Sequence, residues 1–339
     1  MLTLSTLLSL PVFLSTTIIA HALAAPELTY RDNKDDNDNL AASLTGGEKC
    51  DKKELKAIQE GFVEMNKLFQ ASIKVNWNRS AEQEFFGKPE RLQNYTAMVE
   101  ANLLRASQYS YLQGNTTRNP DIHVRCDDPM KKCQECTRKE GKHVAYTIGN
   151  DPHINFCERY FDLPKLDDAV EKAAGNLTSN LEIMSYYNRA TAWARQVMHI
   201  SAVGVGVVEK AVVNSQSQTT FVWTTYQYTG PLNVSFLAGV KNEHPDTNGP
   251  NNIEALKYGY GANRAKLLAV LSTQMPYDAL NNPDNYALYA QARYVMEKKG
   301  LYPNFPVMQF DDEMEVLSNE QLQDGARPRY ACFDALDIV

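Results

Sequence analysis

The spacing of apolar residues along the chain predicts several helices. After Asp51, the apolar residues that recur every three or four positions, as in an amphipathic helix, are Leu55, Ile58, Phe62, Met65 and Phe69. Asp51 suits the position that caps the start of this helix, and Glu54 follows three residues later, as in a capping box. Four further stretches with a helical pattern are residues 89–106, 183–199, 254–271 and 286–299.

A second pattern, in which apolar and polar residues alternate, predicts a small sheet in the middle of the chain. It is found in residues 122–126 and 144–148, and a third short stretch of this kind covers 154–157. Residues 219–229 are rich in β-branched and aromatic side chains, which predicts a strand or one arm of a hairpin. The combination predicts an α+β fold that is mostly helical, with a small twisted sheet.

The first residues differ in character from the rest of the chain. Residues 1–24 begin with an apolar run and end in Ala22-Leu23-Ala24, a pattern typical of a signal-peptide cleavage site. An N-terminal membrane anchor is the alternative, and no later stretch is apolar for long enough to span a bilayer. Residues 25–49 are mostly polar and predict a disordered lead-in. The remainder, 50–339, shows no internal repeat and is expected to form a single globular domain.

Composition and sequons favour an extracellular protein. The chain has 339 residues, 43% of them hydrophobic, which is enough for a sizeable buried core. Its formal net charge is −7 and it has no basic run, so nucleic acid is not expected as a partner. Sequons of the type Asn-x-Ser/Thr, which accept N-linked glycans in secreted proteins, begin at Asn78, Asn94, Asn115, Asn176 and Asn233.

The cysteines also favour an extracellular location. There are six, at Cys50, Cys126, Cys133, Cys136, Cys157 and Cys332. An even number in a secreted chain favours disulfides, but six cysteines allow about fifteen pairings and the sequence does not choose among them. A zinc ion held by four thiolates is the alternative, and its ligands would be Cys126, Cys133, Cys136 and Cys157.

The most informative stretch for chemistry is Arg195-Gln196-Val197-Met198-His199, at the end of the helix expected over 183–199. In zinc peptidases with the motif His-Glu-x-x-His, two histidines four residues apart hold one metal ion, and the glutamate acts as general base. Here only the second histidine is present, as His199. Arg195 stands at the position of the first histidine, and Gln196 stands at the position of the glutamate.

Several short motifs occur in the same order as in one known family. They are Cys50 with the helix from Lys53 to Phe69, Arg125-Cys126-Asp127-Asp128-Pro129 with Cys133 behind it, Ile154–Cys157, Met198–Gly204, Tyr260–Ala269 and Asn282–Leu288. Over roughly residues 50–300 the chain resembles the fungal secreted HRxxH peptidase family, which includes zinc-scavenging cell-surface antigens and fibrinogen-binding allergens. That family is similar in turn to the deuterolysin-type zinc endopeptidases. The resemblance therefore implies a zincin-like metallopeptidase fold.

The resemblance also implies roles for individual residues. His199 falls on the second histidine of the family motif, and Asp284 falls on its acidic third metal ligand. Zinc is the implied cofactor if this site is retained. From the residues alone, His199 is equally compatible with a buried, hydrogen-bonded histidine, and Asp284 with an N-cap of the helix that follows it.

Arg195 and Gln196 lead us to expect that no cofactor is bound. At an effective dielectric constant of ~20, a single positive charge about 5 Å from a divalent cation repels it by roughly 6–7 kcal/mol. Gln196 cannot act as a general base. We therefore expect the guanidinium of Arg195 to occupy the position of the zinc ion and to pair with Asp284, because a buried carboxylate needs a cation.

These expectations combine into a functional prediction. The chain is expected to be a secreted, extracellular protein of the fungal cell wall with a degenerate zinc motif. As a pseudoenzyme, it would bind an extracellular protein or a cell-wall component without catalysis. The alternative is an active zinc-dependent endopeptidase that recruits another metal ligand in place of Arg195. No transmembrane span is expected in the mature chain.

Overall fold

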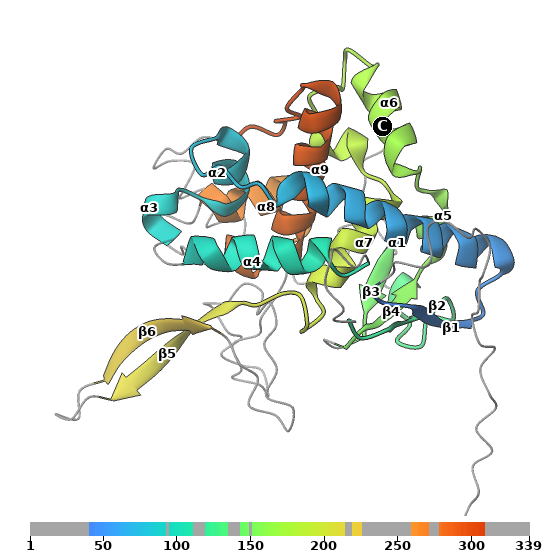
Figure 1. Cartoon of the computed structure of the whole chain (residues 1–339), viewed down its shortest axis with the longest axis horizontal. Helices are drawn as coiled ribbons and strands as arrows, with labels where there is room; N and C mark the ends of the chain where they lie inside the picture. The colour runs from blue at the N-terminus through green and yellow to red at the C-terminus, as the bar shows by residue number, and fades with distance from the viewer. Residues whose placement is uncertain are drawn as a thin grey trace, which may run out of the picture.

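The computed structural model describes most of the chain, drawn in colour in Figure 1. The described residues are 41–92, 95–110, 119–134, 143–148, 151–213, 219–225, 259–270 and 278–308. Side chains are described in all of these ranges except 208–213 and 219–225. The expected signal peptide, 1–24, lies outside the described residues.

Helix α1 spans Lys52–Ser72 and begins where the sequence predicts. The capping box is confirmed, because the Asp51 carboxylate accepts from the backbone N–H groups of Lys53 and Glu54, and the Glu54 carboxylate accepts from the backbone N–H of Asp51. The other α-helices are α2 (Ser80–Phe86), α3 (Pro89–Leu92), α4 (Thr96–Ser107), α5 (Glu158–Asp162), α6 (Leu166–Ala174), α7 (Arg189–Met198), α8 (Ala262–Val270) and α9 (Pro283–Lys299). Single turns of 3₁₀ helix are η2 (Lys132–Gln134), η3 (Ile183–Tyr186) and η5 (Ala279–Asn281).

Two of the expected helices are divided. The structure has α3 and α4 in place of one helix over 89–106. The helix expected over 183–199 is interrupted at Asn188, whose backbone is extended and whose side chain accepts from the N–H groups of Ala190 and Thr191. This N-cap starts α7 at Arg189 and leaves η3 as a separate turn before it.

Four strands form a sheet in the order β1-β2-β4-β3. β1 (Leu44–Glu48), β2 (Ile122–Arg125) and β4 (His153–Phe156) are parallel, and β3 (Ala145–Thr147) pairs antiparallel with β4 at the edge. The three strands predicted from alternation are therefore confirmed. β1 corrects the prediction that residues 25–49 form a disordered lead-in, since 44–48 belong to the sheet. Its two glycines weaken the strand signal in the sequence, and pairing with β2 supplies the order.

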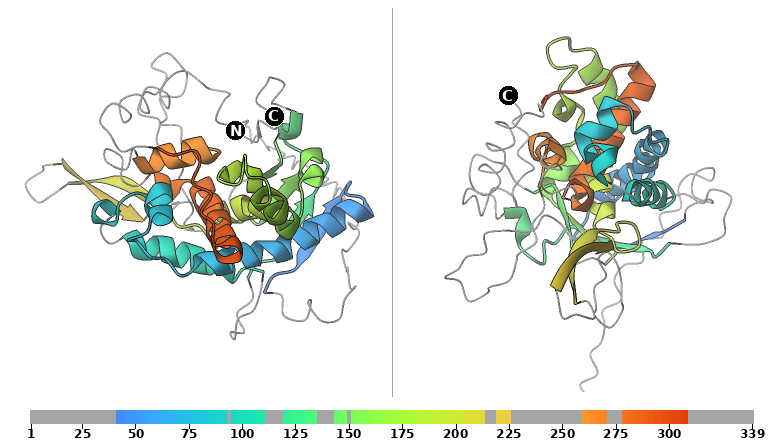
Figure 2. Two further views of the ribbon diagram at one scale, coloured as in Figure 1. Left: turned by 90° about the horizontal axis from the view of Figure 1, so that it is seen from above. Right: turned by 90° about the vertical axis from the view of Figure 1, so that its left-hand side faces the viewer.

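Helix α7 lies in the core between the other helices and the sheet. Every residue from Ala190 to Met198 is buried. The Trp193 ring centroid lies 5.1 Å from that of Phe62 on α1 and 4.8 Å from that of Phe156 on β4. Helix α9 packs against both α1 and α7, and Figure 2 shows this group of helices from above. The architecture confirms the predicted α+β class, mostly helical with a small sheet.

A hairpin leaves this body after α7. β5 (Val207–Val213) pairs antiparallel with β6 (Thr219–Thr225), and the ribbon projects away from the helices in Figure 1. β6 confirms the strand expected from residue 219 onward, whereas β5 was not predicted. In the part of the chain that the structure describes, no helix combines the length and the apolar character needed to cross a bilayer.

Two disulfides tie loops to the sheet. Cys50, just after β1, is bonded to Cys126 at the end of β2, and Cys133 in η2 is bonded to Cys157 at the end of β4. The alternative of a four-thiolate zinc site is wrong, because these disulfides use three of the four cysteines that would hold the zinc ion. The remaining cysteines, Cys136 and Cys332, lie outside the described residues.

The close contact between α1 and α7 depends on Gly61. A Cβ atom at this position would lie 2.8 Å from Cδ1 of Trp193 and would also clash with the hydroxyl of Tyr160. Those two side chains donate hydrogen bonds to the carbonyls of Ile58 and Ala57 on α1. The missing side chain of Gly61 therefore allows the two polar groups to reach the helix backbone.

We predict that Gly61→Ala destabilises the protein although alanine favours helix. Overpacking of a tight interior contact costs about 1–3 kcal/mol, which exceeds the gain of about 1 kcal/mol in helix propensity. Urea unfolding followed by circular dichroism measures the difference. Gly175→Ala, at the exposed end of α6, is the control and should change the free energy of unfolding by less than about 0.5 kcal/mol. Equal effects of the two substitutions would contradict this packing.

Candidate functional site

Arg195 and Asp284, two of the residues that the sequence analysis singled out, form an ion pair in the core. The Nε and Nη2 atoms of Arg195 donate to the two carboxylate oxygens, and the Nη2–Oδ2 distance is 3.1 Å. The side chains are only 4% and 1% exposed. This two-bond arrangement matches the planar fork of a guanidinium to a carboxylate. The expected pairing of Arg195 with Asp284 is thus present, between α7 and the first turn of α9.

The protein surrounds this ion pair with further polar and aromatic groups. The Cζ atom of Arg195 lies 5.5 Å from the centroid of the Tyr187 ring and 5.1 Å from that of Tyr260. The backbone N–H of Gly261 donates to Oδ2 of Asp284 over 2.6 Å. A buried ion pair is stable only where other groups replace the lost water, and these contacts supply that replacement.

Asp284 is not the N-cap of α9, which corrects that alternative. Asn282 occupies the N-cap, Pro283 is the first helical residue, and Asp284 follows it in the first turn. A carboxylate at this place benefits from the positive end of the helix dipole, in addition to its bond with Arg195.

His199 ends α7 one turn after Arg195 and is 8% exposed. Burial is the main cause that lowers the pKa of His199 to about 3, and the positive charges of Arg195 and Lys132 act in the same direction. The imidazole is therefore neutral at physiological pH. A neutral imidazole can bind a metal, but the same cationic surroundings disfavour a divalent ion.

Gln196 fastens α7 to the edge of the sheet. Its Nε2 donates to the carbonyl of Ala145 over 3.1 Å, and its Oε1 accepts from the hydroxyl of Thr147 over 2.9 Å. The backbone carbonyls of Val144 and His153 accept from Cys157 and Ile148, respectively, across the β3–β4 pair. By alternation, the Ala145 carbonyl therefore faces the open edge of β3. The side chain of Gln196 therefore satisfies a carbonyl that no neighbouring strand reaches in the described part of the chain.

Three asparagines around Asp284 hold the neighbouring segments in place. Asn281 bonds to both the N–H and the carbonyl of Val207, and Asn282 bonds in the same way to Gly259. Asn285 donates to the carbonyls of Phe85 and Ala265. The sequence analysis did not recognise these residues as functional, although repeated asparagines in Asn281-Asn282-Pro283-Asp284-Asn285 mark the segment. They fix the backbone that carries Gly261 and Asp284 against Arg195.

A zinc site requires three or more protein ligands. Even together, His199 and Asp284 would supply only two of the ligands that zinc needs. In the ranges that the structure describes, no group of three or more histidine, cysteine, aspartate or glutamate side chains is arranged to hold a metal ion. The carboxylate of Asp284, which the resemblance implies as the acidic ligand, is already paired with Arg195.

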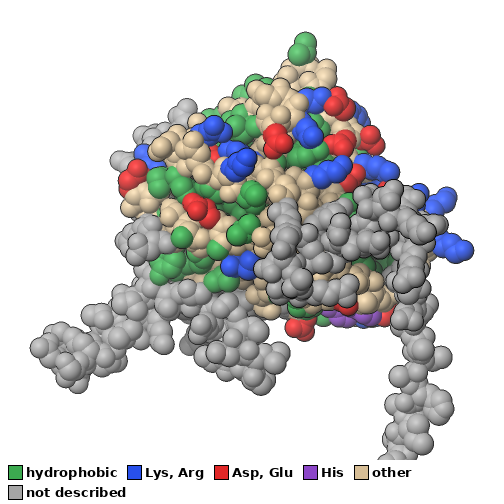
Figure 3. All heavy atoms as spheres, in the orientation of Figure 1, with side chains coloured by type: hydrophobic (Ala, Val, Ile, Leu, Met, Phe, Trp, Pro, Cys, Tyr) green, Lys and Arg blue, Asp and Glu red, His purple; other side chains and the backbone are tan. Residues whose placement is uncertain are grey.

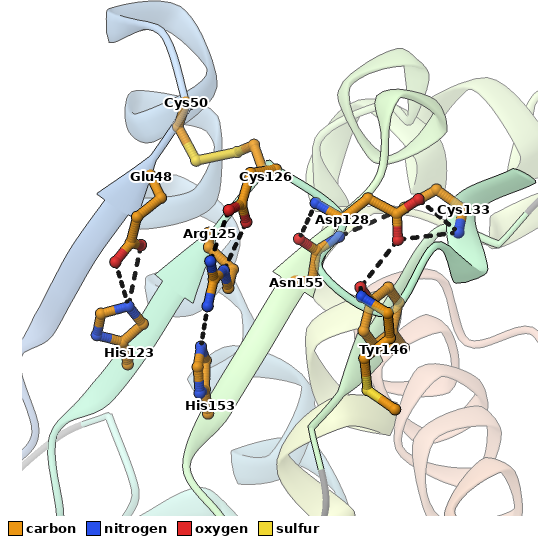
Figure 4. Close-up of polar contacts among 12 residues, drawn as sticks. Glu48, Cys50, His123, Arg125, Cys126, Asp128, Cys133, Tyr146, His153 and Asn155 are labelled. Carbon is orange, nitrogen blue, oxygen red and sulfur yellow. Dashed lines mark hydrogen bonds and ion pairs between the residues drawn. A yellow bond between two sulfur atoms is a disulfide. The ribbon is translucent and has the colours of Figure 1, made fainter.

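A second polar cluster lies on the outer face of the sheet (Figure 4). Nε2 of His123 lies 2.8 and 2.9 Å from the carboxylate oxygens of Glu48, and Arg125 forms a two-bond pair with Asp127. The rings of His123 and His153 are 4.5 Å apart, and Nε2 of His153 lies 3.4 Å from Nη1 of Arg125. Histidines and acidic side chains are visible together at the lower edge in Figure 3.

His153 resists protonation in this cluster. Burial lowers its pKa most, the positive charges of His123 and Arg125 lower it further, and Glu48 and Asp127 oppose the shift. The Nη1–H of Arg125 can donate only to an unprotonated Nε2. Protonation of His153 therefore removes this contact and adds a positive charge beside Arg125.

Of the five predicted glycosylation positions, two lie in the described part of the chain. Asn78 precedes α2 and Asn176 follows α6, and both are exposed. Asn94, Asn115 and Asn233 lie outside the described residues.

No protein-family model matches the chain, and no curated protein matches it significantly.

We predict that Asp284→Asn strongly destabilises the fold. The amide leaves the buried guanidinium without a counter-charge, which costs about 3–5 kcal/mol. Glu171→Gln is the control, because it removes an ion pair with Lys299 whose side chains are 71% and 26% exposed, and it should cost less than about 1 kcal/mol. Urea unfolding at neutral pH measures both. Adding Arg195→Met to Asp284→Asn should recover part of the loss, and an equal cost for Asp284→Asn and Glu171→Gln would contradict the role of the buried pair.

We also predict that His153 makes the protein less stable in mild acid. Its pKa is lower in the folded chain than the ordinary value of 6.5, so the unfolded chain binds more protons below pH 6.5. Stability is therefore lost as the pH falls from 6.5 toward the folded pKa. His153→Asn should lose less stability than the natural chain between pH 7.5 and 5.5, in urea titrations at each pH. Lys56→Gln, at an exposed position, should leave the pH dependence unchanged. A steeper loss of stability in His153→Asn as the pH falls would contradict the lowered pKa of His153 in the folded chain.

Proposed function

We propose that this chain is a secreted, non-catalytic member of the zincin-like peptidase group, in which an arginine replaces the zinc ion. The observation that carries the proposal is the buried pair of Arg195 and Asp284. It joins the two positions that the family resemblance assigns to the first metal ligand and the acidic third ligand. A cation is thus present where the resemblance places the metal, and it is part of the chain itself.

The surroundings of the motif support the loss of catalysis. A zinc peptidase needs a general base beside the metal-bound water. Gln196 has no basic group, and both ends of its amide are bonded to β3. Water activation at this site would require both a metal and a base. Arg195, at the position of the first metal ligand, is instead part of the buried ion pair. Gln196, at the position of the base, links α7 to β3.

The fold and the disulfides support the remaining parts of the proposal. The sheet has an antiparallel edge strand beside α7, an arrangement compatible with a zincin-like scaffold. The two disulfides are compatible with an oxidising, extracellular compartment. With catalysis lost, we propose a binding role toward an extracellular protein or a cell-wall component. Retention of the purified chain on isolated fungal cell walls, compared with bovine serum albumin, tests this role.

We predict that the natural chain has no metal-dependent peptidase activity. The assay uses casein and a fluorogenic peptide, with added zinc or with a chelator. The rate should equal that of the buffer under both conditions, because neither a metal nor a base is available. Peptide cleavage that zinc increases and the chelator abolishes would establish the alternative, an active zinc endopeptidase.

Restoring the motif should restore metal binding. Arg195→His with Gln196→Glu removes the internal cation and adds a histidine four residues before His199, which gives three protein ligands with Asp284. We expect about one zinc per chain after dialysis, measured by mass spectrometry of the metal. Arg195→Gln with Gln196→Glu is the matched control, since it removes the charge without adding a histidine. Equal zinc content in the two variants would contradict the zincin-like register of the motif.

A further inference from the structure

The loop after α6 exposes an unusual amount of apolar side chain. Leu177 is 87% exposed, and Leu181 in the same loop is 36% exposed. Backbone bonds from Ser179 to Asn176 and from Glu182 to Ser179 fold this loop into successive turns. A single exposed leucine is common on protein surfaces, but the neighbouring segment adds more apolar surface here.

That neighbouring segment contains Phe305 and Val307. The backbone N–H of Phe305 donates to the carbonyl of Leu181 over 2.8 Å, so the two segments lie side by side. Phe305 is 46% exposed and Val307 is 48% exposed. We call the four residues Leu177, Leu181, Phe305 and Val307 the loop patch. Exposed apolar residues that gather on one part of a surface often mark a place where another group binds.

The same loop carries the sequon that begins at Asn176, and two hydrogen bonds fix the side chain of this asparagine. Oδ1 of Asn176 accepts from the backbone N–H of Thr178 over 3.1 Å and from its hydroxyl over 2.8 Å. Asn176 and Thr178 are both exposed. The Nδ2 atom of Asn176 takes no part in these two bonds. A sugar on Nδ2 would therefore preserve both hydrogen bonds.

We propose that Asn176 carries an N-linked glycan whose first sugars cover the loop patch, beginning with the adjacent Leu177. The inference rests on the proposed secretion of the chain. Sugar rings have apolar C–H faces that can pack on leucine side chains, while their hydroxyl groups remain in water. The glycan is thus the occupant that is covalently attached next to the most exposed part of the patch.

Attachment of the glycan to Asn176 requires neither an oxidant nor a reductant. Nδ2 of Asn176 forms a bond to the anomeric carbon of an oligosaccharide that is carried on a lipid pyrophosphate. The bond between that carbon and the pyrophosphate oxygen breaks, the lipid pyrophosphate leaves with the electron pair, and the proton lost by Nδ2 is released to water. Thr178 completes the sequon that the transferring enzyme recognises.

Asn78 provides an internal comparison. It is exposed and also begins a sequon, but Arg79 and Ser80 after it are exposed polar residues, and Trp77 before it is partly buried against the core. A glycan at Asn78 would cover no comparable apolar surface. Removal of a glycan from Asn78 should therefore leave the exposed apolar area unchanged, whereas removal from Asn176 should increase it.

The first experiment locates the glycan. The full chain is secreted from a yeast host, treated with an amidase that removes N-glycans in heavy-oxygen water, and analysed by peptide mass spectrometry. We expect the heavy-oxygen conversion of asparagine to aspartate at Asn176, its loss in Thr178→Ala and its retention in Thr178→Ser. Glycans at other sequons with none at Asn176 would overturn this inference alone. Retention of the chain inside the cell, with no sequon modified, would overturn the proposed secretion as well.

The second experiment tests whether the glycan covers the patch. Binding of a hydrophobic dye is compared between the glycosylated chain and Asn176→Gln. We expect the dye fluorescence of Asn176→Gln to rise about twofold or more. The rise should be smaller when Asn176→Gln is combined with Leu177→Ser, because the most exposed residue of the patch is then polar, and it should be absent in Asn78→Gln. An equal rise in Asn78→Gln, or no rise in Asn176→Gln, would overturn the covering role.

Discussion

The ion pair between Arg195 and Asp284 is the interaction on which this account depends. It joins α7 to α9 in the core, with both side chains almost completely buried. Such a pair contributes little by itself, because removal of two charges from water costs nearly as much as their attraction returns. Its importance is conditional: once the carboxylate of Asp284 is placed in the core, a cation must accompany it. The chain supplies that cation as a guanidinium, which needs no metal from outside and cannot lose its charge at physiological pH.

The rest of the site consists of groups that hold this pair in place. Tyr187 and Tyr260 lie against the guanidinium, Gly261 donates to the carboxylate, and Asn282 fixes the backbone at Gly259. These groups come from segments that are far apart in the sequence. Among the described residues, this region is therefore a buried polar cluster held together by hydrogen bonds and an ion pair.

Much of the fold was predictable from the sequence, because capping and alternation are local signals. The capping box of Asp51 and Glu54 and the strands β2 and β4 are examples. β1 was missed because its glycines carry no strand preference and its order comes from pairing with β2. The pairing of Arg195 with Asp284, 89 residues apart, followed from the family resemblance and not from any local pattern. The bonds of Gln196 to β3 depend on how the sheet meets α7, and no property of the sequence alone indicates them.

The zinc content of the natural chain tests the central claim most directly. The protein is produced in medium supplemented with zinc, dialysed against buffer without a chelator, and analysed by mass spectrometry of the metal. Because the guanidinium of Arg195 holds the carboxylate of Asp284, we expect a zinc content indistinguishable from that of the dialysis buffer. About one zinc per chain, retained after dialysis, would show that a metal occupies the site and would contradict the account.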